Sequence, residues 1–207
     1  MTPDVGDVRN SRIPEQTPSN AAFADTPNLA LCKIQITRPS AGRACRKGAT
    51  MATFKQSDVH LLALLNALAP FRGGKCLAAT VLALTRELGV RLAFVAERRG
   101  DMAHAVAMAD RQDLKQPFFY DPKPQPCRAV LNGEVLSVPC NVSQLYAGNE
   151  GFQAYFGVPL KNEQGQVIGL LAVMDVHPFD REKVINDVLI PLAPRIAAEL
   201  ECAAIEE

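Results

Sequence analysis

Gly157-Val158-Pro159-Leu160 and Val167-Ile168-Gly169-Leu170-Leu171-Ala172-Val173-Met174-Asp175 are two apolar runs, and the polar linker Lys161–Gln166 joins them. Apolar runs on either side of a polar linker that contains glycine are typical of an antiparallel hairpin. We therefore predict strands over 155–160 and 167–175. Pro159 has no backbone N–H to donate, which indicates an edge or bulge position, and glycine inside a strand indicates close approach by a neighbouring group.

The chain before this hairpin alternates between helical and extended patterns. Leucines at helical spacing predict a first helix that Ser57 or Asp58 caps and that ends at Ala69, before Pro70. The other predicted elements are a helix over 75–88, strands over 90–98 and 102–109, a loop over 110–126, a short helix over 126–131, a strand over 135–138 and a short helix over 142–146.

After the hairpin, Asp180 is the predicted N-cap of a last helix that reaches Leu200. Pro191 and Pro194 each remove a backbone donor, so we expect them to kink or break this helix. Helices at both ends of the chain with mainly antiparallel strands between them predict an α+β sandwich, in which the helices cover one face of the sheet.

Residues 1–53 differ in composition from the rest of the chain. They are rich in proline and small polar residues and contain no sustained apolar period. Too little apolar surface is present to offset the entropy of ordering, so we predict a disordered or poorly structured extension. Residues 54–207 are then the single folded domain.

Charge and targeting signals exclude several functions. The chain contains 22 Lys and Arg against 22 Asp and Glu residues. This balance provides no basic face for nucleic acid and no attraction to an anionic membrane surface. The chain has no apolar run of about 18 residues and no signal peptide at its start, so we expect a cytoplasmic protein.

Cysteine and histidine spacing predicts no metal site. The six cysteines are scattered without a CxxC pair, and in a reducing compartment we expect reduced thiols. The three histidines, His60, His104 and His177, lie far apart on different predicted elements. One alternative remains for His104, which could serve as an axial haem ligand.

The segment Pro126-Cys127-Arg128-Ala129-Val130-Leu131-Asn132-Gly133, together with the hairpin quoted first, resembles the GAF family. This resemblance covers roughly residues 55–201. It implies a profilin- or PAS-like central antiparallel sheet of about five to six strands. Helices from both chain ends would pack on one face, with loops and short helices over a pocket on the other. Members of the family bind cyclic nucleotides, tetrapyrroles or small acids, so the resemblance implies a sensory or regulatory domain but leaves the ligand and any cofactor unknown.

The resemblance also indicates where a ligand would bind. The predicted ligand-binding residues are mostly aromatic or apolar, as small-molecule pockets are: Phe94, Phe118, Phe119, Tyr120, Cys127, Val138, Tyr155 and Phe156. For Cys127 three roles remain open: core packing, ligand contact or redox sensing, and covalent attachment of a chromophore. Bilin-binding members usually place histidine after that cysteine, where this chain has Arg128.

One enzyme branch resembles this chain, the free methionine-(R)-sulfoxide reductases. Their chemistry needs at least two thiols in the pocket. The stretch Asn149-Glu150-Gly151-Phe152 contains no cysteine at the position where that branch carries its nucleophile. We therefore predict no catalytic residues and no enzyme activity, with this reductase as the alternative.

The family resemblance finally implies partners. The first and last helices of such domains often pair between two subunits, so we expect a homodimer through those helices. The chain ends just past its last predicted helix, so we expect it to act in trans on a separate output protein. A protein–protein regulatory module without a ligand is the alternative to a ligand sensor.

Overall fold

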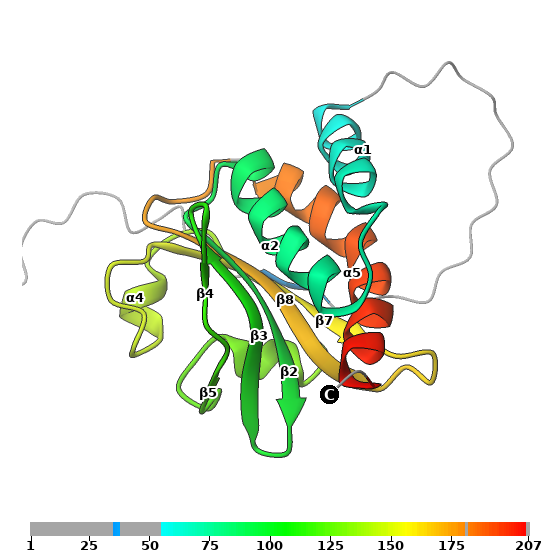
Figure 1. The fold of residues 1–207 in the computed structure, drawn as a ribbon. Coiled ribbons are helices and arrows are strands. Elements are labelled where there is room, and N and C mark those ends of the chain that lie inside the picture. The colour runs from blue at the N-terminus through cyan, green and yellow to red at the C-terminus, as the bar shows by residue number, and fades with distance from the viewer. Residues whose placement is uncertain (1–34, 38–54, 181, 206–207) are drawn as a thin grey trace, which may run out of the picture. The chain divides into compact units, whose positions relative to one another are not determined.

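The computed structural model describes residues 35–37, 55–180 and 182–205. The extension predicted to be poorly structured, residues 1–53, thus lies outside the described residues apart from 35–37. Figure 1 shows the helices and strands of the described chain. The helices are α1 (Gln56–Leu68), α2 (Gly73–Leu88), α3 (Cys127–Leu131), α4 (Val142–Leu145) and α5 (Glu182–Ile205). The strands are β1 (Gln35–Thr37), β2 (Leu92–Arg99), β3 (Met102–Asp110), β4 (Asp113–Lys115), β5 (Phe118–Tyr120), β6 (Val135–Val138), β7 (Ala154–Lys161) and β8 (Val167–Asp175). They follow the order β1-α1-α2-β2-β3-β4-β5-α3-β6-α4-β7-β8-α5 along the described chain.

The described strands form one eight-stranded sheet. Seven of them follow the order β1-β6-β7-β8-β2-β3-β4, and the eighth, β5, pairs with a different part of β3 than β4 does. Every pairing is antiparallel. The five longer strands are those that the sequence predicts. The predicted loop over 110–126 is wrong in part, because it contains the three-residue strands β4 and β5.

The quoted hairpin is confirmed as β7 and β8, with Gly157 opposite Ala172 and Leu160 opposite Gly169. Pro159 lies inside β7, yet the ladder to β6 ends at Gly157. The missing N–H of Pro159 therefore removes no ladder bond on that side. Pro159 thus lies where β7 has no neighbouring strand on one side, which is a local edge as predicted. Over residues 155–157, β7 is a central strand between β6 and β8.

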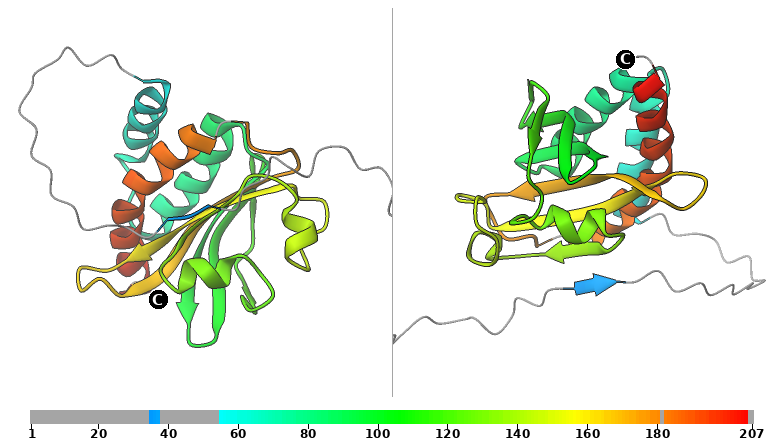
Figure 2. Two further views of the ribbon diagram at one scale, coloured as in Figure 1. Left: turned by 180° about the vertical axis from the view of Figure 1, so that it is seen from behind. Right: turned by 90° about the horizontal axis from the view of Figure 1, so that it is seen from below.

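The two faces of the sheet carry separate apolar cores. Helices α2 and α5 lie on one face, and α3 lies on the other (Figures 1 and 2). Because side chains alternate along a strand, Phe156 and Val158 of β7 point to the helices while Tyr155 points to α3. This arrangement confirms the predicted α+β sandwich.

Local capping differs from the prediction at the start of α1. The N-cap residue is Lys55, and Asp58 accepts a hydrogen bond from the Lys55 backbone N–H at 2.9 Å. Ser57 lies inside the helix, where its buried hydroxyl donates to Asp187 Oδ2 of α5 at 3.3 Å. Ser57 thus joins two helices instead of capping one. At the other end of the helical pair, α2 stops at Gly89, whose φ of 66° is left-handed.

Pro191 and Pro194 lie inside α5, which nevertheless runs from Glu182 to Ile205 as one helix. Both prolines are exposed, three residues apart on the solvent side of the helix. Water can therefore bind the carbonyl groups that the prolines leave unpaired. Of the predicted kink or break, the break therefore does not occur. None of the helices in the described part of the chain is long and apolar enough to cross a membrane.

Candidate functional site

Five of the eight predicted ligand-binding residues meet on the α3 side of the sheet. Phe94, Cys127, Val138 and Tyr155 are buried in this core, and Tyr120 packs against it from β5. Each comes from a different element: β2, α3, β6, β7 and β5. Residues far apart in the sequence thus form one compact cluster beneath α3.

The other three predicted residues lie elsewhere. Phe156 belongs to the core on the helical face, because it follows Tyr155 in the same strand and must point the opposite way. Phe118 and Phe119 are 43% and 61% exposed. The Phe119 ring stacks on His104 of β3, with ring centroids 4.3 Å apart and 10° between the planes. Phe119 and His104 are directly opposite in the ladder between β3 and β5.

Three polar groups are enclosed within the α3-side core. The Tyr155 hydroxyl donates to Cys127 Sγ at 3.8 Å. The Tyr120 hydroxyl oxygen is buried close enough to the same thiol to interact with it, but it makes no hydrogen bond of ordinary distance and angle among the described residues. We name Tyr120, Cys127 and Tyr155 the thiol–phenol cluster. The core around these groups is mostly apolar, so it combines apolar walls with a few polar atoms, as the linings of small-molecule sites do.

Burial governs the acid–base properties of the thiol–phenol cluster. Desolvation raises the pKa of the Cys127 thiol, and it raises the pKa of the Tyr155 phenol well above its ordinary value. The pKa of Tyr120 is also raised, first by burial and then by the neighbouring Cys127. All three groups are therefore protonated at neutral pH. A protonated thiol is a weak nucleophile, which disfavours covalent chemistry at Cys127.

Gly157 explains how the Tyr155 ring reaches the thiol. A Cβ at position 157 would overlap the Tyr155 phenol and would come within 2.9 Å of Val130 Cγ2. Tyr155 and Gly157 are two residues apart on the same face of β7, so the ring lies across the space that a side chain would take. The sequence signals a close approach at this glycine but does not identify the neighbour.

The cysteines are not all reduced, contrary to the prediction. Cys76, Cys127 and Cys202 are free thiols, with Cys76 and Cys127 buried and Cys202 exposed. Cys140 is disulfide-bonded. Cys127 and Cys140 are therefore not bonded to each other.

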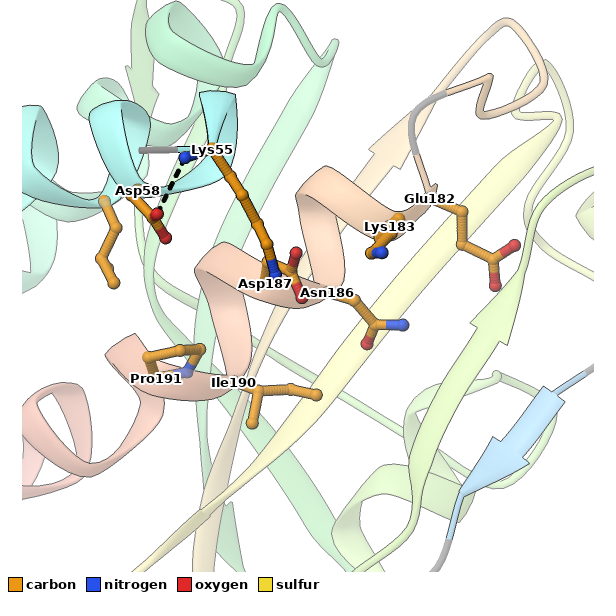
Figure 3. Close-up of a pocket in the computed structure, with 9 residues that line it drawn as sticks. Lys55, Asp58, Glu182, Lys183, Asn186, Asp187, Ile190 and Pro191 are labelled. Carbon is orange, nitrogen blue, oxygen red and sulfur yellow. Dashed lines mark hydrogen bonds between the residues drawn. The ribbon is translucent and has the colours of Figure 1, made fainter. Parts of the chain in front are cut away.

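A second candidate surface is a groove of about 770 Å³ between α1 and the first half of α5 (Figure 3). Its walls mix charged and apolar side chains, among them Lys55, Leu61, Asp187 and Ile190. Apolar residues also reach solvent on the same two helices: Val59 is 57%, Leu62 50% and Ile190 46% exposed. Scattered apolar residues are ordinary on a surface, but of these three Ile190 also lines the groove.

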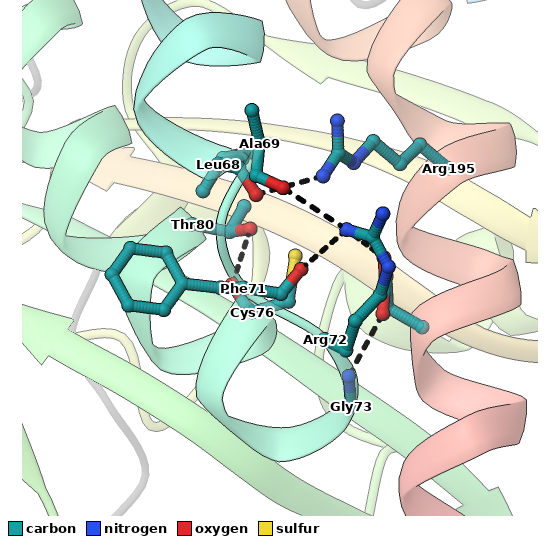
Figure 4. Close-up of polar contacts among 9 residues, drawn as sticks. Leu68, Ala69, Phe71, Arg72, Gly73, Cys76, Thr80 and Arg195 are labelled. Carbon is teal, nitrogen blue, oxygen red and sulfur yellow. Dashed lines mark hydrogen bonds and ion pairs between the residues drawn. The ribbon is translucent and has the colours of Figure 1, made fainter.

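Helix α5 also holds the connection between α1 and α2 (Figure 4). Arg195 donates to the Leu68 carbonyl in the last turn of α1 at 2.8 Å. Glu199 accepts from the Gly73 backbone N–H in the first turn of α2 at 2.8 Å, and its carboxylate lies 3.8 Å from the Arg72 guanidinium. A cation at a helix C-terminus and an anion at a helix N-terminus both complement the helix dipoles. One turn of α5 therefore fixes the ends of both neighbouring helices.

The geometry above can be compared with known proteins. Residues 74–185, just over half of the chain, match the sequence model of the GAF domain. No curated protein sequence is similar enough to count as a relative.

Solved structures share the fold at low sequence identity. The GAF domain of an Acinetobacter phosphoenolpyruvate-protein phosphotransferase is 13% identical over 74% of this chain and 98% of that chain, with a TM-score of 0.58. The substrate-bound free methionine-R-sulfoxide reductase of Neisseria meningitidis is 15% identical over 77% and 99%, with a TM-score of 0.58. The phycoerythrobilin-bound GAF domain of a cyanobacterial phytochrome is 12% identical over 73% and 97%, with a TM-score of 0.51. At these identities the likeness concerns the fold and not the ligand.

Proposed function

Since this chain belongs to the GAF domain family, we propose that it is a sensory or regulatory domain that binds a small molecule at the thiol–phenol cluster. The observation that carries the proposal is the Tyr120 hydroxyl, which is buried and, apart from its approach to the Cys127 thiol, has no polar partner in the described structure. An unpaired buried hydroxyl is costly, and a ligand that pairs with it relieves that cost.

The surroundings of the cluster define the chemistry of the ligand. Phe94, Val138 and Leu170 supply an apolar wall, so most of the ligand surface is apolar. One polar group of the ligand pairs with the Tyr120 hydroxyl. Strand β5 is the element that must yield on entry, because it has three residues and carries the exposed Phe118 and Phe119.

The test is native mass spectrometry of the full-length chain purified from a bacterial host, with an absorption spectrum of the same sample. We expect a stoichiometric mass above that of the polypeptide, and visible absorption identifies a tetrapyrrole. Tyr120→Phe removes only the unpaired hydroxyl, so it should leave the melting temperature of the ligand-free protein unchanged or raise it while lowering ligand occupancy. Equal occupancy in the variant and the wild type, or a polypeptide mass alone in both, contradicts the proposal.

The proposed role is binding and not catalysis. Burial raises the pKa of Cys127, and its described partner is the Tyr155 hydroxyl, not a base that would remove the thiol proton. Turnover of free methionine sulfoxide by the purified protein, with a thiol reductant supplied, would overturn this part of the proposal.

A second function concerns α1 and α5. We propose that these two helices pair with the same helices of a second copy, because Val59 and Leu62 of α1 and Ile190 of α5 are exposed, and Ile190 also lines the groove between the two helices. A two-fold pairing brings the same patch of both subunits together and buries these side chains. Light scattering after size exclusion should give the mass of a dimer at micromolar concentration, and the mass of a monomer contradicts the pairing.

A further inference from the structure

A small hollow of about 140 Å³ lies next to α3, outside the thiol–phenol cluster. Its lining comes from the tip of the β2–β3 hairpin, from the loop before α3 and from α3 itself. Met102 and Leu131 provide apolar contact within it. The hollow is thus assembled from three separate segments, which hold its lining residues at fixed positions.

The lining of the hollow is positively charged. Arg98 of β2, Lys123 of the loop and Arg128 of α3 carry three positive charges, and Asp101 carries the one carboxylate among the lining residues. A local charge of three minus one, or plus two, stands out in a chain whose formal net charge is zero. None of the ion pairs within the described residues includes Arg98, Lys123 or Arg128. The three cations are therefore available to an external anion.

One of these cations is already oriented. Arg98 Nη1 donates to the Leu131 carbonyl at the end of α3, at 3.3 Å. This bond ties the Arg98 side chain of β2 to the end of α3, and within the described residues the other guanidinium donors have no partner. A guanidinium fork held in place loses less conformational entropy when it binds an oxyanion than a free one does.

We propose that this hollow binds a phosphate group, either free or as the end of a small organic molecule. Two arginines and a lysine around one point match the several oxygens and the double charge of a phosphate. The volume of the hollow suits a single phosphate group and not a whole cofactor, because pockets for complete drug-sized ligands measure about 300 Å³ or more. This site does not include Tyr120, so a failure of the phosphate proposal would leave the proposed function unaffected, and the reverse also holds.

The experiment is a titration of the ¹⁵N-labelled full-length chain with inorganic phosphate and, separately, with glycerol 3-phosphate. Backbone amide signals of Gly100 and Asn132, which line the hollow, should shift with saturation. Arg98→Gln and Arg128→Gln should each weaken binding about fivefold or more, since each removes a charged donor. Asp101→Asn should tighten it, because it removes the carboxylate that repels the anion. The probe that binds more tightly identifies the free or the esterified form.

The matched control is Arg86→Gln, which removes an exposed arginine from α2, away from the hollow. It should leave phosphate affinity within about twofold, because exposed charges farther apart than a Debye length are screened. Three results overturn the proposal: no saturable shift with either phosphate, equal losses in Arg128→Gln and Arg86→Gln, or acetate binding as tightly as phosphate.

Discussion

Position 157 has room for a hydrogen and nothing larger, because the Tyr155 phenol lies over it. Gly157→Ala places a methyl group against Val130 and the tyrosine ring, and overpacking of this kind costs about 1–3 kcal/mol. We expect a loss of that size in the free energy of unfolding, measured by urea denaturation.

Gly74→Ala is the matched control for that substitution. No atom lies within 4 Å of a Cβ at position 74, and the residue is in α2, where alanine is favoured by up to about 1 kcal/mol. The two glycines should therefore respond with opposite signs. A Gly157→Ala variant as stable as Gly74→Ala would show that the Tyr155 ring does not occupy this space.

The thiol–phenol cluster predicts a loss of stability at alkaline pH. Folding raises the pKa of Cys127 above 9.0 and that of Tyr155 well above 10.0, their ordinary values. The unfolded chain therefore releases these protons first, so the stability present below pH 9 falls as the pH rises toward the folded pKa values. Each such group contributes a slope of about 1.4 kcal/mol per pH unit.

Tyr155→Phe tests that account through urea unfolding at several pH values between 7 and 11. The variant lacks one of the groups that titrate, so its free energy of unfolding should fall less steeply above pH 10 than that of the wild type. Parallel curves for the two proteins would exclude Tyr155 as a source of the alkaline loss.

At single residues, the sequence shows the chemical type of each side chain but not the face of the sheet toward which that side chain points. Five of the eight residues predicted to bind a ligand share one cluster, and their role in binding stays a prediction. Phe156 is misplaced because nothing in its identity shows which face of β7 it occupies. The register that decides this is set by pairing with β6 and β8, which are distant in the sequence.

Among the elements, α5 supports the whole helical layer. Glu199→Ala leaves the first turn of α2 without its acceptor and the Arg72 guanidinium without its partner. Removing one member of a buried, charged hydrogen bond costs about 1–3 kcal/mol, and we expect that loss in urea denaturation. Glu201→Ala, an exposed glutamate on the same helix, should change stability by no more than about 0.5 kcal/mol. Similar losses in both variants would mean that Glu199 does not hold α2.

The longer elements that the sequence predicts correctly have enough residues to show a period: helices α1, α2 and α5 and strands β2, β3, β7 and β8. The short elements α3 and β6 are predicted from proline and turn signals beside them instead. Strands β4 and β5 have three residues each, too few for a pattern, and they exist because the long β3 offers them unpaired backbone groups. Their formation is a tertiary effect that no local signal reports.

On the scale of the whole molecule, the α1–α5 face makes a prediction about assembly. Leu62→Glu places a charge among the apolar side chains that pairing would bury, so a dimer should dissociate to a monomer in light scattering. Leu145→Glu is the control, since Leu145 is equally exposed at 51% but lies on α4. A dimer that survives Leu62→Glu and dissociates with Leu145→Glu would move the interface to the α4 side.

The fold as a whole is readable from the sequence, while the ligand is not. Structures of 12–15% identity share the sheet and its helices with this chain. Those proteins nevertheless include a phycoerythrobilin-bound domain and a reductase, by their own descriptions. A backbone pattern tolerates many side chains at the cluster beneath α3, so the fold limits where a ligand binds without selecting it.

Tyr155 and Phe156 are consecutive residues in β7, yet they belong to different cores. The proposed ligand site and the helical layer are therefore connected by a single peptide bond, the one between Tyr155 and Phe156. Any shift of β7 that accommodates a guest beside Tyr155 displaces Phe156 among the packed side chains of α5, which also fixes the ends of α1 and α2. Under the proposed function, a change at the ligand site would reach the helical layer without a moving domain, because the same strand contributes side chains to both cores.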